Sequence, residues 1–215
     1  MNQLASMSAA AIAALLTPVF FGSANGEQQS SGAPKTVSKS GIPYLPDSDD
    51  AGPPDLVKAI RARRKGKLLN LDRMLLHSPN FAKGWNSMFA AIRNELSLQP
   101  KLREIAILAV GALNKAEYEW IHHEPEFLAA GGTREQLAAL KNVEAAQKNT
   151  KLFDEPERAT LAFTTEMTKN IRVSPATLKR VRAVLPDQQT VELIGTIAGY
   201  NMASRFLIAT GVDLE

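Results

Sequence analysis

The chain contains no cysteine among its 215 residues. It therefore cannot form a disulfide within itself, and it offers no thiolate as a nucleophile or metal ligand. This absence agrees with either an exported or a cytoplasmic protein. Aromatic residues make up only 6% of the chain, but 45% of the residues are hydrophobic, which is enough for the core of one ordinary domain.

The chain also has little excess charge of either sign. Its formal net charge is +3 and its isoelectric point is near 9.2, values that do not by themselves indicate a nucleic-acid partner. A basic run extends from Lys58 to Lys67, but no aromatic residues interleave it and no nucleic-acid motif accompanies it. We interpret this run as a solvated helix end or a subunit contact, and predict that no nucleic acid binds.

Long hydrophobic runs are absent as well. Residues 8–21 are apolar and precede a Gly-Ser-Ala sequence, so residues 1–24 resemble a signal peptide. Pro18 interrupts the apolar segment, which is too short for a membrane span, and we predict no stable membrane insertion. No Lys or Arg precedes Lys35, so the usual basic start of a signal is missing. Export through an atypical signal and a cytoplasmic location both stay open.

The rest of the chain divides into two parts. Residues 25–54 are rich in Ser, Gly, Pro, Gln and Asp, which predicts a flexible linker. Residues 55–215 should form the folded domain. No segment of it shows sustained strand alternation, whereas Pro, Gly and a Thr133–Gln136 capping box mark successive helix starts and ends. We therefore predict an all-α helical bundle.

The most informative stretch runs from residue 100 to residue 124. Its first half, Leu102 to Leu113, is apolar almost all round, as expected of a helix at the centre of a core. Glu104 lies within it, where a carboxylate is costly to bury without a partner. A second helix should begin near Ala116. On that helix Glu119 and His123 are four residues apart and can touch, which is a suitable acid–base pair near neutral pH.

These residues carry a resemblance to a known family. Alkylhydroperoxidase D proteins have a Glu, eleven further residues, and then Cys-x-x-Cys-x-x-x-His. The same frame here holds Glu104, Ala116, Glu119 and His123, so both cysteine positions are changed. The surrounding sequence resembles the cysteine-free branch of the carboxymuconolactone decarboxylase family. The resemblance implies an alkylhydroperoxidase D-like bundle that assembles into trimers or hexamers, and the missing thiols exclude thiol peroxidase chemistry.

The resemblance also implies a function. It indicates a cofactor-independent carboxy-lyase of the 4-carboxymuconolactone decarboxylase type, acting in aromatic catabolism on a carboxylated lactone or related small organic acid. In this hypothesis His123 donates the proton, Glu119 orients its imidazole and Glu104 tunes the pair. We predict no cofactor and no metal.

A substrate carboxylate would need a cationic anchor. The candidates are Arg103, Arg73 and Arg205, and Tyr118 and Trp120 are further candidates for substrate contact. Helix geometry turns Arg103 about 100° away from Glu104. Arg205 could be an anchor or the structural partner of a buried Glu.

Two alternatives remain open. Glu104, Glu119 and His123 could be a buried polar network in a non-catalytic small-molecule-binding or oligomeric structural protein that keeps the fold. Alternatively, Glu119, His123 and His77 could bind a metal ion. An open pocket at His123 would favour the enzyme, and a closed, fully hydrogen-bonded His123 would favour the structural network.

Overall fold

The computed structural model describes residues 36–215, which form ten α-helices. The prediction of an all-α fold is confirmed, since the β structure in this range is one isolated bridge between Val37 and Pro43. The predicted signal peptide, residues 1–24, lies outside the described residues. The helices are α1 Pro54–Arg63, α2 Asn70–Leu75, α3 Pro79–Asn94, α4 Pro100–Asn114, α5 Glu117–Ala129, α6 Arg134–Leu140, α7 Val143–Ala146, α8 Glu155–Asn170, α9 Pro175–Val184 and α10 Asp187–Thr210.

Local sequence signals set the helix boundaries. Proline occupies the start of α1, α3, α4 and α9, where its missing N–H costs nothing. The Thr133 side chain accepts a hydrogen bond from the Gln136 backbone, which completes the predicted capping box of α6. Gly211 ends α10 with a φ of 60°, a conformation that glycine adopts without strain.

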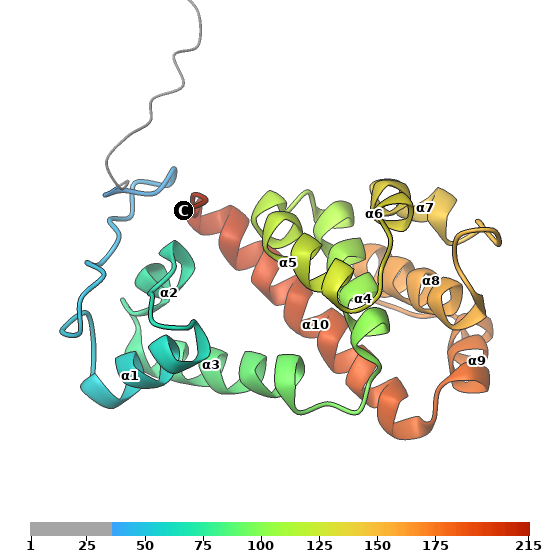
Figure 1. Ribbon diagram of the computed structural model, residues 1–215, viewed down its shortest axis with the longest axis horizontal. Helices are drawn as coiled ribbons and strands as arrows, with labels where there is room; N and C mark the ends of the chain where they lie inside the picture. The colour runs from blue at the N-terminus through green and yellow to red at the C-terminus, as the bar shows by residue number, and fades with distance from the viewer. Residues whose placement is uncertain (1–35) are drawn as a thin grey trace, which may run out of the picture. The chain divides into compact units, whose positions relative to one another are not determined.

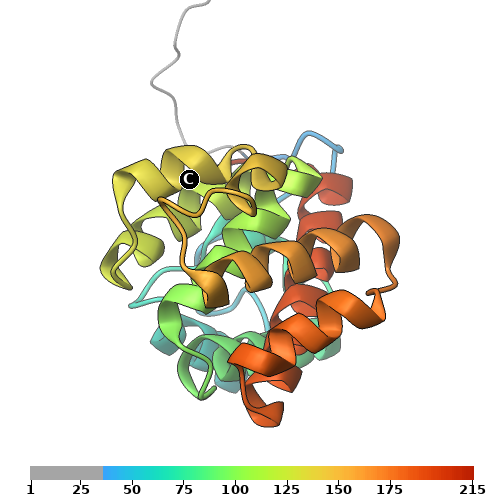
Figure 2. The same cartoon turned by 90° about the vertical axis from the view of Figure 1, so that its right-hand side faces the viewer.

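The helix α4 is the centre of the core. It packs against α5, α8 and α10, and Figure 1 shows α4 and α10 side by side. Every residue from Glu104 to Gly111 is buried. Figure 2 shows α8 and α9 as neighbours on the side of the domain away from α1. As predicted, this nearly all-apolar helix gains its stability from burial on every side.

A second group of helices, α1 to α3, reaches the core through α3, which packs against α10. The short helices α1 and α2 both pack on α3. This arrangement leaves the ends of α1 and α3 facing α5, and the candidate site lies between them.

The segment between residues 36 and 54 differs from the predicted flexible linker. Tyr44 and Ala51 are buried, and the Tyr44 hydroxyl contacts both the backbone and the side chain of Asp213. Lys39 donates its backbone N–H to the carbonyl of Gly211. Polar composition suggested a linker, but a few anchoring residues suffice to pack this segment against the end of α10.

None of the helices within residues 36–215 is both long enough and apolar enough to cross a membrane.

Two glycines should respond in opposite ways to alanine. A Cβ at Gly132 would lie 2.3 Å from the ring of Phe127, which is fully buried, so we expect Gly132→Ala to cost about 1–3 kcal/mol of unfolding free energy. Gly195 is exposed on α10 with nothing within 4 Å of its missing Cβ, so Gly195→Ala should gain about 0.5–1 kcal/mol. Urea denaturation of both variants tests this, and a neutral Gly132→Ala would contradict the packing.

Candidate functional site

Two consecutive helices bring the predicted acid–base residues together. Glu104 lies on α4, and Glu119 and His123 lie on α5. Lys115 has a φ of 57° and reverses the chain between the helices, so that α5 returns along α4. Gly111 lies where the two helices meet, and a Cβ at this position would be in ordinary van der Waals contact with the Glu119 Cβ, at 3.6 Å.

The imidazole of His123 lies between the two carboxyl groups. Its Nδ1 is 2.7 Å from Glu104 Oε2, so Nδ1 carries the proton and donates it to that carboxylate. Its Nε2 faces Glu119 Oε2 at 3.6 Å, which is too long for a hydrogen bond. Glu104 therefore holds the orienting position that helical spacing predicts for Glu119. Helical spacing shows the Glu119 contact, but only helix packing reveals the shorter one.

The Arg103 side chain contacts Glu104 although the two positions diverge by about 100° on the helix. Arg103 Nε donates a hydrogen bond to Glu104 Oε1 at 3.1 Å. The two Cα–Cβ bonds do diverge on the helix, but the arginine side chain is long enough to fold back. Glu104 is 1% exposed, so Arg103 and His123 together supply the partners that a buried carboxylate requires.

The two carboxyl groups have opposite electrostatic environments. Burial raises the pKa of Glu104, but the hydrogen bond and charge of His123 and the charge of Arg103 outweigh burial, and its pKa is lowered overall. Burial also raises the pKa of Glu119, and there the charges of the nearby histidines and arginines do not outweigh it. Glu104 is thus held as a carboxylate, and Glu119 is biased toward the neutral acid.

A small cavity adjoins His123 and Glu119. Its volume is about 30 Å³, enough for one water molecule. His123 is 3% exposed. The cavity has apolar walls from α2, α3 and α10 and a polar side from α1, α3 and α5. Its lining residues are Arg63, Arg64, Leu71, Trp85, Phe89, Arg93, Tyr118, Glu119, His122, His123, Tyr200 and Ala203.

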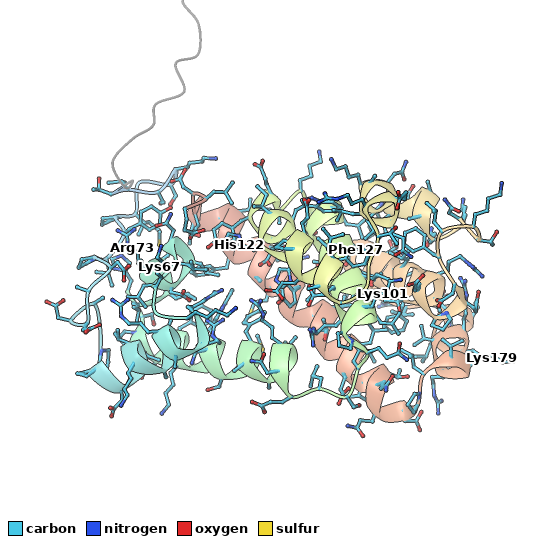
Figure 3. All side chains as sticks on the ribbon, in the orientation of Figure 1. Lys67, Arg73, Lys101, His122, Phe127 and Lys179 are labelled. Carbon is cyan, nitrogen blue, oxygen red and sulfur yellow. The ribbon has the colours of Figure 1, made fainter. Side chains whose placement is uncertain are left out.

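A larger basic cleft of about 390 Å³ shares part of this wall. Five cationic side chains and two carboxylates line it. Figure 3 labels His122, which lines both spaces, on the side of α5 toward α2. The lining residues of the basic cleft are Arg63, Arg64, Lys65, Arg93, Asn94, Arg103, Glu104, His122 and Glu126.

The cations of the basic cleft are only partly neutralised. Arg63 and Arg64 share one buried carboxylate, Asp72, at 3.4 and 3.0 Å. Arg93 lies 3.4 Å from Glu126, which is largely exposed. Burial, reinforced by the charge of Arg64, lowers the pKa of Arg63 to about 10. This excess of positive charge favours an anionic ligand.

Other predicted site residues lie elsewhere. Arg73 donates to the carbonyl oxygen of Leu45, and the exposed Arg205 donates to Asn201. Within residues 36–215 neither arginine lines the cavity or the basic cleft, and Arg205 pairs with no buried Glu. Trp120 instead borders a separate surface groove. Tyr118 does line the small cavity, and its hydroxyl donates to Glu215 Oε1 at 2.9 Å.

The alternative metal site is not assembled. His77 Nε2 lies 2.7 Å from the carbonyl oxygen of Pro43 and does not join Glu119 and His123. Within residues 36–215 no three His, Asp or Glu side chains form a group that could hold a metal ion.

Sequence reasoning missed several residues of the site. Arg63 and Arg64 belong to the basic run that the sequence predicts to be a solvated helix end or a subunit contact. The sequence shows their positive charge, but it does not show that their side chains face the site. Arg93 at the end of α3 gave no signal. Tyr200 of α10 packs its ring edge-on to His123, with centroids 5.0 Å apart, and sequence spacing could not place it there.

His122, the neighbour of His123 in the sequence, forms a separate contact. Its Nδ1 lies 2.8 Å from the carbonyl oxygen of Tyr118, and its Nε2 lies 3.0 Å from Glu215 Oε2. Burial lowers the pKa of His122, but these two hydrogen bonds and the Glu215 charge raise it overall. Burial raises the pKa of Glu215, but the hydrogen bonds from His122, the Asn70 backbone and the Tyr118 hydroxyl, with the His122 charge, hold it below its usual range.

This contact predicts a pH-dependent stability. The raised pKa of His122 contributes stability that is complete below its ordinary value of 6.5 and is lost as pH rises through the folded value. The lowered pKa of Glu215 contributes stability that is complete above pH 4.5, the ordinary pKa of a glutamate, and is lost as pH falls through the folded value. Because both groups are partly exposed, we expect only about 0.5–1 kcal/mol.

Urea denaturation at about pH 5.5 and about pH 8.5 measures this effect. The wild type should lose more unfolding free energy between these values than the Glu215→Gln variant. Parallel losses in the two proteins would contradict the assigned contact.

Taken together, the fold and the site define an all-helical protein with a buried carboxylate–imidazole–carboxylate cluster beside a basic cleft. Residues 79–153, from α3 to the loop after α7, match the model of the carboxymuconolactone decarboxylase family. This segment contains Glu104, Glu119 and His123. A search of curated proteins gives no match.

Solved structures show the same fold at low sequence identity. A peroxidase-related protein from Silicibacter sp. TM1040 is 18% identical with a TM-score of 0.69, and the alignment covers 87% of this chain and 96% of that one. An alkylhydroperoxidase AhpD core protein from Ralstonia eutropha JMP134 is 17% identical with a TM-score of 0.66, and the alignment covers 80% of this chain and 90% of that one. The debrominase Bmp8, as a cysteine-to-alanine variant in complex with 2,3,4-tribromopyrrole, is 18% identical with a TM-score of 0.68. The alignment covers 80% of this chain and 90% of the debrominase.

These findings agree with the resemblance that the motif indicates. Residues 79–153 are similar to the carboxymuconolactone decarboxylase family, and residues 36–215 have an AhpD-like fold, in a chain with no cysteine in its sequence.

Proposed function

We propose that this protein is a cofactor-independent lyase that removes a carboxyl group from a carboxylated lactone or a related small organic acid. The observation that carries the proposal is the cluster of Glu104, His123 and Glu119, whose two carboxyl groups have pKa values pushed in opposite directions. Groups separated in this way can divide the roles of acid and base.

The chemistry asks little of the protein beyond proton delivery and binding. When the carbon–carbon bond to the carboxylate breaks, its electron pair can move into a conjugated carbonyl of the substrate, and carbon dioxide leaves. The resulting enolate carbon then takes a proton from Nε2 of the doubly protonated His123 ring, which leaves a neutral imidazole with its proton on Nδ1. Glu104 holds the imidazole in place and stabilises its charged form through the 2.7 Å hydrogen bond.

The basic cleft supports a carboxylated substrate. Its guanidinium groups can bind carboxylates in a bidentate manner, and its volume of about 390 Å³ suits a small organic acid. Arg64 and Arg93 line both this cleft and the small cavity at His123. A substrate held by them would therefore lie next to the acid–base cluster. The tribromopyrrole complex of the debrominase is consistent with a small cyclic ligand in this fold.

The trimer or hexamer implied by the family remains part of the proposal. Several large apolar side chains are exposed on the single chain and could be covered in such an assembly, among them Phe81, Ile171, Val191 and Ile208.

A second candidate is a non-catalytic protein that binds a small anion in the same place. The small volume at His123 favours it, because a space of about 30 Å³ cannot hold an organic acid unless the site opens. In this case the cluster would stabilise the packing of α4 and α5, and the basic cleft alone would bind the ligand.

A direct assay separates the two candidates. The purified full chain is mixed with carboxymuconolactone-type acids, and the loss of ultraviolet absorbance is followed with and without a chelator. Turnover that resists the chelator supports the lyase. Binding detected by calorimetry without turnover of any of these acids would favour the non-catalytic protein.

A further inference from the structure

Glu119 is a buried carboxyl group without a hydrogen bond. Its side chain is 7% exposed, and among residues 36–215 its carboxyl forms no hydrogen bond. Its nearest charged partner is His123 Nε2, at 3.6 Å. Leaving such a group unpaired in a core is costly, so its position calls for an explanation.

The surroundings of Glu119 favour its neutral form. It faces the small cavity, whose apolar walls include Trp85, Phe89 and Ala203. Ionisation would place a second buried carboxylate beside an imidazole that Glu104 already holds. Burial raises the pKa of Glu119 despite the charges of His123, His122, Arg64 and Arg93.

We propose that Glu119 is the proton store of the site, a neutral carboxylic acid at rest that supplies the proton which His123 delivers. This inference rests on the proposed function. Glu119 acts through His123, so it is a positioning and proton-storing residue. It occupies the place of the second cysteine in the related motif, where this chain has exchanged a thiol for a carboxyl group.

The proton moves in two balanced steps. The O–H bond of Glu119 breaks as an N–H bond forms at His123 Nε2, which leaves an imidazolium between two carboxylates. That N–H bond then breaks as the C–H bond of the product forms. The separation of 3.6 Å must close to hydrogen-bond length, or the single water that the cavity can hold must bridge it. A proton from solvent restores the acid.

Infrared difference spectroscopy tests the resting state without any substrate. Near pH 7 the wild type should show the C=O stretching band of a protonated carboxyl group, and Glu119→Gln should lack it. Glu117→Gln is the matched control, since Glu117 is exposed on the same helix, and it should keep the band. If the Gln variant does not fold, a pH titration of this infrared band in the wild type still shows whether a carboxyl group is protonated near pH 7. A spectrum without a protonated carboxyl near neutral pH would overturn the proposal.

Kinetics test the role of the stored proton. Glu119→Gln should lower kcat by about 10–100-fold and remove one ionisation from the pH profile of kcat, and Glu119→Asp should restore part of both. If kcat and its pH profile were unchanged in Glu119→Gln, Glu119 would not supply the proton that His123 delivers. This would hold even if the infrared band showed that Glu119 is protonated at rest. If no acid is turned over, the lyase proposal fails, and the infrared band still decides the protonation of Glu119.

Discussion

Replacing His123 with asparagine should lower kcat for a carboxylated substrate by about 10²–10⁴-fold while the melting temperature stays near that of the wild type. An asparagine amide can donate to Glu104 from the place of Nδ1, so the buried carboxylate keeps a partner. The same amide cannot take up or release a proton near neutral pH. The variant therefore separates the acid–base role of the imidazole from its packing role, and steady-state kinetics and thermal unfolding measure the two.

The matched control is His77→Asn. His77 is exposed and bonded to the carbonyl of Pro43, outside the cluster, so this variant should keep full turnover. Undiminished turnover in His123→Asn would rule out the imidazole as the proton donor. A wild type without turnover, in which removing His123 costs several kcal/mol of stability, would instead identify the cluster as a structural network.

Replacing Arg93 with glutamine should weaken binding of a carboxylated ligand by about 10–100-fold, the equivalent of about 1.5–3 kcal/mol for a charged hydrogen bond. Arg93 lines both the basic cleft and the small cavity, and its present partner, Glu126, is largely exposed. Its loss should therefore leave the fold intact. Isothermal titration calorimetry at two salt concentrations measures the change, and the salt dependence should weaken with the lost charge.

Arg172→Gln controls for net charge. Arg172 is exposed in the loop between α8 and α9 and lines neither space, so its variant should bind like the wild type. Equal losses in the two variants would mean that the overall field, and not the basic cleft, attracts the ligand. Equal affinity in Arg93→Gln and the wild type would remove Arg93 from the site.

The membership of the acid–base cluster could be predicted because it depends on spacing along the chain. Glu119 and His123 are four positions apart, and a helix brings such residues together whatever surrounds it. Glu104 could be included through the family frame. Its 2.7 Å hydrogen bond to His123 could not be foreseen, because it joins two helices and depends on how α5 returns along α4.

The substrate-binding side was harder to predict. Arg63 and Arg64 were visible as part of a basic run, but a run of charge is usually solvated and says nothing about which helix it will face. Arg73, Arg205 and Trp120 are candidates by residue type and local sequence, and the fold places them outside the cavity and the basic cleft. Polar composition predicts a linker at residues 36–54, because composition does not show which residues, such as Tyr44, anchor the segment to the domain.

The sequence by itself determined the helices, the buried carboxylate on the central one and the exclusion of thiol chemistry, because these follow from hydrophobic periodicity, helix signals and the residues present. Only the tertiary structure decided which carboxyl group holds His123, which one has its pKa raised by burial, and which arginines form the basic cleft. Those properties depend on burial and on distances between helices far apart in the chain, and a pKa or an ion pair is set by these distances and not by sequence order.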